Sequence, residues 1–320
     1  QLARIDLSNN GVRLNTDSVD NSGGVNMSDY EVNLKILLQQ MLRRGHIKSK
    51  KERDDLLISA TDEISELVLA NNRGQHRLIS MDSIRSNLNF RLFRKLISHL
   101  EENGMNKRIE HIPSWSELNQ LENADMPLPR PVLCVLMAYS KMEVFDALSS
   151  SEMPLEEELT KYYLEYLPWT VRDSFGENVI DHPLKKEIIS TVLTNRITNQ
   201  AGSTFISRMA HGSEQSIPDV VRTYLVIESS LEAETIREEL YSLTDISEKE
   251  RYEELIELED VIKTLVRNVL NGQDLLPGFE QIEQFKALLQ ELLKYQEISR
   301  NEEKSDLVMP EADKAKEDEE

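Results

Sequence analysis

The sequence has little cysteine and no long apolar run. Its single thiol, Cys134, cannot form a disulfide within the chain, and we interpret it as a small apolar residue of a helix. The longest apolar stretch, VLCVLMAY at 132–139, is far shorter than the roughly 20 residues of a transmembrane helix. No secretory signal precedes it, because QLARIDLSNN lacks a basic region followed by an apolar one. We therefore expect a cytoplasmic protein without a membrane segment.

Positive charge is also scarce. The chain has 37 lysines and arginines against 58 aspartates and glutamates, which gives a formal net charge of -21 over 320 residues. This charge repels the phosphates of nucleic acids and the surface of an anionic membrane, so neither is an expected partner. A composition of 39% apolar and 30% charged residues is that of a globular chain with a substantial core.

Local catalytic motifs are missing as well. The six histidines lack the spacing of metal ligands, and neither HExxH nor CxxC occurs, so no metal site is predicted. The sequence contains no GxSxG, no Walker A loop and no GxGxxG. It therefore has no nucleophile elbow and no dinucleotide-binding fold of its own, and no catalytic residue is assigned to it.

What the sequence does contain is helical periodicity, nearly throughout from residue 28 onward. S-x-x-E capping boxes predict helix starts at Ser49, Ser114 and Ser247. The fold is therefore expected to be mainly α. The expected helices cover about 29–44, 49–68, 82–102, a short segment from 114, 131–148, 154–166, 170–178, 183–201, 203–210, 218–230, 232–243, 247–270 and 279–299.

The end of the chain has a different composition. Residues 301–320, NEEKSDLVMPEADKAKEDEE, are acidic and contain no aromatic residue. Such a segment buries too little apolar surface to offset the entropy of ordering, so 300–320 is predicted to be a disordered tail. The other end begins with Gln1 in place of Met, as expected of a piece of a longer protein or of a processed chain.

The polar stretch DSVDNSGGVNMSDYE at 17–31 differs from the rest of the chain. Gly23 and Gly24 favour a tight turn with positive φ, and Ser28 with Glu31 forms another capping box. A helix that starts at Ser28 would offer free N–H groups and a hydroxyl to a carboxylate. Spacing alone leaves two interpretations open: Ser28 binds a ligand, or it only caps its helix.

The residues around this stretch resemble a known family. RIDLSNNGVRLNTDSVDNSGGVNMSDYEVNLKILL at 4–38 closely resembles the end of the catalytic region of the large bacterial NAD-specific glutamate dehydrogenases. PLPRPVLCVLMAYSKM at 127–142 and HPLKKEIISTVLTNRITNQAGSTFISRM at 182–209 look like two further motifs of that family. The second motif departs from the family at Pro129 and Val132, where Thr and Glu are usual.

The resemblance spans about residues 1–270 and implies both an architecture and a reaction. It implies that 1–45 end an α/β catalytic domain, that 46–299 form a multi-helix C-terminal domain, and that 300–320 are the tail. The implied reaction is oxidation of L-glutamate to 2-oxoglutarate and ammonia, with NAD as the cofactor. The implied partners are the upstream catalytic part of the same enzyme and further copies in a homo-oligomer.

Compact glutamate dehydrogenases carry the similar segment NAGGVTVSYFEW, which implies roles for individual residues. By this resemblance Asn21, with Gly23 and Gly24 as the turn, binds the nicotinamide end of the cofactor, and Ser28 binds the substrate carboxylate. The family's catalytic Lys and Asp belong upstream of Gln1, so the isolated chain is expected to be inactive. The alternative is a non-enzymatic helical interaction protein, or the remnant of a split or decaying gene.

Overall fold

The computed structural model describes residues 2–272, 276–288 and 290, and within them the chain is helical with no β-strand. The predicted tail at 300–320 and most of the second half of the predicted helix at 279–299 lie outside the described residues. The α-helices are α1 Leu2–Asn9, α2 Asp17–Asp20, α3 Ser22–Arg43, α4 Lys50–Ser59, α5 Thr61–Leu88, α6 Phe90–Glu102, α7 Trp115–Asn123, α8 Arg130–Ser149, α9 Thr160–Tyr166, α10 Trp169–Phe175, α11 Lys185–Ala201, α12 Phe205–Ser213, α13 Ile217–Ser230, α14 Ala233–Ser242 and α15 Glu248–Gly272. Four short 3-10 helices are η1 Met153–Leu155, η2 Glu157–Leu159, η3 Gly176–Ile180 and η4 Phe279–Gln281.

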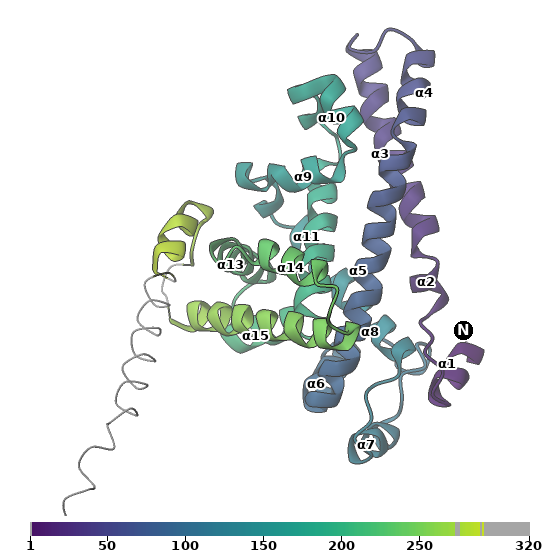
Figure 1. The fold of residues 1–320 in the computed structure, drawn as a ribbon, viewed down its shortest axis with the longest axis vertical. Coiled ribbons are helices and arrows are strands. Elements are labelled where there is room, and N and C mark those ends of the chain that lie inside the picture. Colours follow the sequence, from purple (N-terminus) through teal and green to yellow (C-terminus); the bar gives the residue numbers. More distant parts are fainter. Residues whose placement is uncertain (1, 273–275, 289, 291–320) are drawn as a thin grey trace, which may run out of the picture.

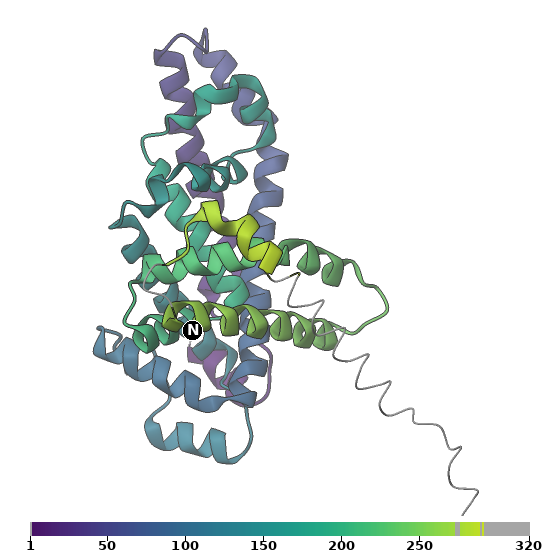
Figure 2. The same cartoon turned by 90° about the vertical axis from the view of Figure 1, so that its left-hand side faces the viewer.

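Two long helices set the shape of the molecule. α3 and α5 pack against each other along the long axis, and α15 crosses that axis steeply (Figure 1). α14 packs against α15, and the loop between them projects from the side of the bundle (Figure 2). None of the helices in the described part of the chain combines the length and apolar character needed to cross a membrane.

The apolar side chains gather in two large clusters. The larger one joins α3 and the first half of α5 to α9, α11, α13 and α15, and it includes Leu37, Tyr163 and Val266. The second lies where the end of α5 meets α6, α7 and α8, and the predicted apolar Cys134 is buried there. Because α3 and α11 share a core, the first 45 residues fold against the later helices. The predicted domain boundary at residue 45 stays a prediction.

Local capping chemistry explains several helix starts. The Ser114 hydroxyl accepts a hydrogen bond from the backbone N–H of Glu117. The Glu117 carboxylate accepts one from the backbone N–H of Ser114, as predicted for a capping box. Ser247 and Glu250 make the same reciprocal pair ahead of α15. At Ser49 only one of the two capping-box bonds forms: the Ser49 hydroxyl accepts the Glu52 N–H. The Glu52 carboxylate accepts the N–H of Lys48 in place of that of Ser49. Each predicted start is confirmed within one residue.

The expected boundaries between residues 49 and 102 were wrong. The helix predicted to run from Ser49 to Val68 breaks at Ala60, and α5 then continues without interruption to Leu88. The polar residues at 71–75, which fall between the two predicted helices, lie inside α5. Gly74 allows close packing there, because a Cβ at this position would come within 2.9 Å of Asn199 Nδ2 on α11. Contact with α11 therefore outweighs the low helix propensity of this stretch.

A buried ion network joins α11, α13, α14 and α15. Arg237 on α14, with its side chain only 2% exposed, donates to Glu228 on α13 and to Glu259 on α15. Tyr224 donates to Glu259 Oε2 at 3.0 Å, and Arg196 Nε donates to Glu228 Oε2 at 3.2 Å. Burial and then the charge of Glu259 raise the pKa of Tyr224 well above its ordinary value. The guanidinium groups of Arg237 and Arg196 together neutralise the two buried carboxylates.

A second buried pair holds the turn between α11 and α12. Asp82 and Arg85 on α5 pair at 3.0 Å. Asp82 Oδ2 accepts the Ser203 N–H at 3.0 Å, and Arg85 Nη2 donates to the Gln200 carbonyl at 3.0 Å. Gly202 lies between these two contacts with φ 93° and ψ 160°, a conformation that other residues rarely adopt.

Lys141 on α8 is a half-buried lysine with a neutral partner. Its Nζ donates to Asn195 Oδ1 on α11 at 2.9 Å, and no salt bridge to Lys141 forms within the described residues. Burial lowers the pKa of Lys141 from 10.5 to about 7. The folded protein therefore loses the Lys141 proton at a lower pH than the unfolded chain does.

We expect Lys141→Met to stabilise the protein, and to do so most at pH 7 and below. Between the folded pKa of about 7 and the unfolded value of 10.5, the unfolded chain binds more protons at Lys141. The stability of the wild type therefore rises over this window relative to the variant, by up to about 1.4 kcal/mol per pH unit. Urea unfolding of both proteins from pH 6 to 9.5 measures the difference. A difference independent of pH would show that Lys141 does not titrate in this window.

Candidate functional site

The N-terminal segment is held on α5 and α8 through Asn15. Asn15 Nδ2 donates to Asp20 Oδ1 at 3.1 Å and lies 2.9 Å from His76 Nδ1 on α5. Arg130 Nε, at the start of α8, donates to Asn15 Oδ1 at 2.8 Å, and Arg4 Nη1 donates to the Asn15 carbonyl at 3.1 Å. One buried amide thus ties together α1, α2, α5 and α8.

Two asparagines of α5 hold the start of α3. Asn72 Nδ2 donates to the Val19 carbonyl at 3.0 Å and to Ser22 Oγ at 2.8 Å. One residue earlier, Asn71 Nδ2 donates to Asn26 Oδ1 at 2.9 Å. These bonds cross between the two long helices and fix the junction of α2 and α3 from the side of α5.

The glycine pair lies inside α3, so the predicted turn was wrong. α3 begins at Ser22, and neither Gly23 nor Gly24 has a positive φ. The physical reason is tertiary. Asn72 anchors Ser22, and the Cα of Gly23 packs so close to α5 that a Cβ would lie 3.5 Å from Val68 Cγ1. These contacts favour a helical backbone where composition alone favoured a loop.

The predicted capping box at Ser28 was also wrong. Ser28 lies in the second turn of α3, where its Oγ donates to the Gly24 carbonyl at 3.3 Å. Glu31 pairs with Lys35 one turn further on. Because the helix starts six residues earlier, the backbone N–H groups that a cap would receive are already used inside the helix.

The structure nevertheless brings three of the four predicted site residues to one face. Asn21, Gly24 and Ser28 are spaced three and four residues apart on α3, and all three are exposed. Val25 and Val32 flank them, 68% and 54% exposed. Gly23 faces α5 instead. We call Asn21, Gly24, Val25, Ser28 and Val32 the α3 strip.

The α3 strip presents one amide and one hydroxyl on its exposed face. The side-chain amide of Asn21 makes no hydrogen bond within the described residues, and the missing side chain of Gly24 leaves room for the Asn21 Oδ1, 3.2 Å from where a Cβ would lie. An amide and a hydroxyl can bind and orient a ligand, but neither is an acid or base near neutral pH. The strip can therefore position a ligand, whereas proton transfer needs other groups.

The residues that support the strip were missed by the sequence analysis. They are Asn15, Asn71, Asn72, His76 and Arg130. The adjacent asparagines Asn71 and Asn72 could have indicated a contact between α5 and another segment. Asparagine is a poor residue for a helix interior unless its side chain has a hydrogen-bond partner. The partners lie about 50 positions away in sequence, at Ser22 and Asn26, and spacing within one helix cannot indicate them.

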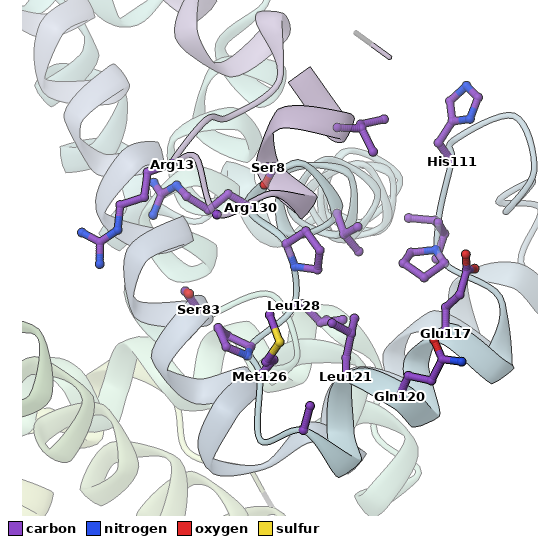
Figure 3. A pocket seen from close by; sticks show the side chains of 18 of the residues that line it. Ser8, Arg13, Ser83, His111, Glu117, Gln120, Leu121, Met126, Leu128 and Arg130 are labelled. Carbon is purple, nitrogen blue, oxygen red and sulfur yellow. The ribbon is translucent and has the colours of Figure 1, made fainter. Parts of the chain in front are cut away.

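A large cleft lies on the other side of the Asn15 network. It has a volume of about 1530 Å³ and lies among α1, the ends of α5 and α6, the segment around α7 and the starts of α8 and α15. Figure 3 shows Arg13, Arg130, Ser8 and Ser83 at one end of the cleft, and His111, Glu117 and Gln120 at the other. Met126, Leu121 and Leu128 lie between the two ends.

Two family models match the chain. Residues 1–82 match the family described as bacterial NAD-glutamate dehydrogenase, catalytic domain. Residues 125–317 match the family described as glutamate dehydrogenase, C-terminal. The first match includes the α3 strip and the asparagines of α5 that support it.

Curated proteins similar to the chain carry one name. The NAD-specific glutamate dehydrogenase of Halomonas elongata is 29% identical over 294 residues, which are 91% of this chain and 18% of that protein. Proteins of the same name from Pseudomonas aeruginosa and Mycobacterium tuberculosis are 35% and 34% identical, each over 71% of this chain and 14% of their own length. The chain thus spans less than a fifth of these relatives.

Proposed function

Because this chain belongs to the family of large bacterial NAD-specific glutamate dehydrogenases, we propose that it is the C-terminal part of such an enzyme. The proposed reaction converts L-glutamate, NAD and water to 2-oxoglutarate, ammonia and NADH. In this proposal the chain contributes one wall of the active site and a helical domain that braces the wall. The partner that completes the site is the upstream catalytic part of the enzyme.

The observation that carries the proposal is the exposed α3 strip. Two valines more than half exposed flank an unbonded amide and a hydroxyl, on a helix whose other face is fully buried. Contiguous exposed apolar residues with polar groups between them mark a surface that contacts another molecule or domain. The strip also lies in the segment that matches the catalytic-domain family.

The residues present fit the nicotinamide end of NAD. Gly24 has no side chain to hold a flat ring away from the helix, and Asn21 has an amide free to hydrogen-bond a carboxamide. When bound, NAD supplies the hydride acceptor. Asn21 and Gly24 would hold it, with Gly23 packing α3 against α5 behind them. Ser28 would turn its hydroxyl away from the Gly24 carbonyl to donate a hydrogen bond to the substrate carboxylate.

Assembly and location belong to the same proposal. Trp169 on α10 and Ile58 on α4 are 62% and 72% exposed, and these two helices contact each other. Exposed large apolar side chains at one end of the bundle support contact with a further subunit, so we propose a homo-oligomer. We place the enzyme in the cytoplasm, where the single buried thiol stays reduced.

Single substitutions on the α3 strip test these roles in the complete enzyme. Ser28→Ala is expected to raise KM for glutamate about 10-fold, because it removes one hydrogen bond to a charged group, and to leave KM for NAD unchanged. Asn21→Ala is expected to raise KM for NAD and to leave KM for glutamate unchanged. Steady-state NADH formation with each substrate varied in turn measures both.

Ser65→Ala is the matched control. Ser65 is a half-buried serine on α5 whose Oγ donates to the Thr61 carbonyl four residues earlier, as that of Ser28 does to Gly24. The Ser65→Ala variant should leave KM for glutamate and KM for NAD unchanged. Equal effects of Ser28→Ala and Ser65→Ala would overturn the role proposed for Ser28.

A further inference from the structure

The polar end of the large cleft is built around two arginines. Arg130 lies at the first residue of α8, and Arg13 lies in the segment between α1 and α2. Figure 3 shows their side chains next to each other, beside Ser8 and above Ser83. Two like charges at one place are unfavourable unless an anion lies between or beside them.

Arg130 is held in place by neutral groups only. Its Nε donates to Asn15 Oδ1 at 2.8 Å, and its Nη1 donates to Ser80 Oγ at 3.2 Å. The residue is half-buried. Burial lowers the pKa of the Arg130 guanidinium, and the charge of Arg13 lowers it further. The group is therefore oriented but not neutralised.

Arg13 makes no hydrogen bond and no ion pair within the described residues, and its side chain is exposed at the cleft. Asp20, the one carboxylate whose charge favours the charged form of Arg130, already pairs with Arg4 and accepts from Asn15. At the opposite end of the cleft, the Glu117 carboxylate accepts the Ser114 N–H at 2.7 Å. Asp6, Glu101 and Glu248 also line the cleft, but no ion pair among the described residues joins a carboxylate to Arg13 or Arg130.

An apolar wall lies between the two polar ends of the cleft. Met126 and Leu128 lie directly beside the arginine end, and Leu121 continues that wall (Figure 3). Trp115 also lines the cleft. The volume of about 1530 Å³ exceeds that of a typical site for a small organic ligand, about 300 to 1000 Å³. A ligand with an anionic group and an apolar body would match both the arginine end and the apolar wall of the cleft.

We propose that this cleft binds an organic anion, with a carboxylate or phosphate group between Arg13 and Arg130 and an apolar body along Met126 and Leu128. The hydroxyls of Ser8 and Ser83 lie at the same end and are available as further donors. This site is separate from the α3 strip, and it requires no dehydrogenase activity.

The fluorescence of Trp115 provides a direct test on the 320-residue chain. The chain has two tryptophans, and Trp169→Phe leaves Trp115, inside the cleft, as the single reporter. In this background we would titrate 3-phenylpropionate, phenyl phosphate and the neutral 3-phenyl-1-propanol through the millimolar range. The two anions distinguish a carboxylate from a phosphate source, and the alcohol tests whether charge is needed.

We expect a saturable change with at least one of the two anions, and binding about 10-fold weaker in Arg13→Gln, since a hydrogen-bonded charge contributes about 1.4 kcal/mol or more. Arg13→Gln should leave thermal unfolding unchanged because Arg13 has no partner to lose. Arg130→Gln should weaken binding as well, with its unfolding temperature measured beside it. Arg108→Gln, which removes another exposed arginine lining the cleft, is the matched control and should bind as before.

Three results would overturn the proposal. They are the absence of a saturable change with either anion, equal affinity for the alcohol and the anions, and equal affinity of Arg13→Gln and its background. Each is independent of glutamate oxidation, so failure here would leave the dehydrogenase proposal standing.

Discussion

Replacing Arg237 with Leu is expected to lower the free energy of unfolding by about 3 to 5 kcal/mol, because it leaves the buried Glu259 carboxylate without a counter-charge and removes one of the two arginines that pair with Glu228. Glu228 and Glu259 are each 2% exposed, and Arg237 is the group that both contact. Arg196 would still donate to Glu228. Glu259 would keep only the hydroxyl of Tyr224 among the bonds that the structure describes. Urea unfolding followed by circular dichroism measures the loss.

Two comparisons separate this effect from the general cost of losing an arginine. Arg44→Leu removes an exposed arginine whose partner, Asp181, is also exposed, and it should cost less than about 1 kcal/mol. Adding Glu259→Gln to Arg237→Leu should recover part of the stability, because it removes a stranded charge. A loss for Arg237→Leu no larger than that of Arg44→Leu would mean that water reaches the network.

Gly202→Ala is expected to cost about 3 kcal/mol, from backbone strain and from a clash with the buried Asp82–Arg85 pair. Gly202 has φ 93° and ψ 160°, which side chains rarely tolerate. An added Cβ would come within 2.6 Å of Arg85 Nη1 and 2.8 Å of Asp82 Oδ1. Neither side chain can move freely, since each also bonds the α11–α12 turn.

Gly104→Ala is the matched control for strain alone. Gly104 has a similar φ of 102°, but a Cβ there would meet no atom within 4 Å. Gly104→Ala should lower the free energy of unfolding by about 1 to 2 kcal/mol, which is the strain of an unfavourable backbone conformation. The difference between the two variants is the contribution of the clash. Equal losses would show that the Asp82–Arg85 pair yields to the added methyl group.

Helix starts set by short-range chemistry were predictable from the sequence. The reciprocal bonds at Ser114 and Ser247 involve residues three apart. Pro131 lies in the first turn of α8, which agrees with the helix predicted at 131–148. The same rule failed at Ser28, although its spacing to Glu31 is identical. Capping boxes indicate a possible start, but contacts elsewhere decide whether the helix has already begun.

The contacts that decide where a helix begins and ends join residues distant in sequence. The continuation of α5 through 69–81 depends on Gly74 against Asn199 and on Asn72 against Ser22, pairs that periodicity cannot reveal. The resemblance to a family indicated Asn21, Gly24 and Ser28 together, and the structure places them on one exposed face of α3. It could not indicate that Asn15 and α5 hold that face in position, because these supports depend on the packing of this chain.

Glutamate-dependent reduction of NAD is the most direct measure of the central claim, that this chain supplies a binding wall and not the catalytic groups. The purified 320-residue chain should produce no NADH from glutamate, because an amide and a hydroxyl cannot carry the proton transfer. The same chain joined to the upstream catalytic part of the proposed enzyme should be active, and Ser28→Ala should then raise KM for glutamate. NADH production by the isolated chain, or an unchanged KM in the joined enzyme, would contradict the account.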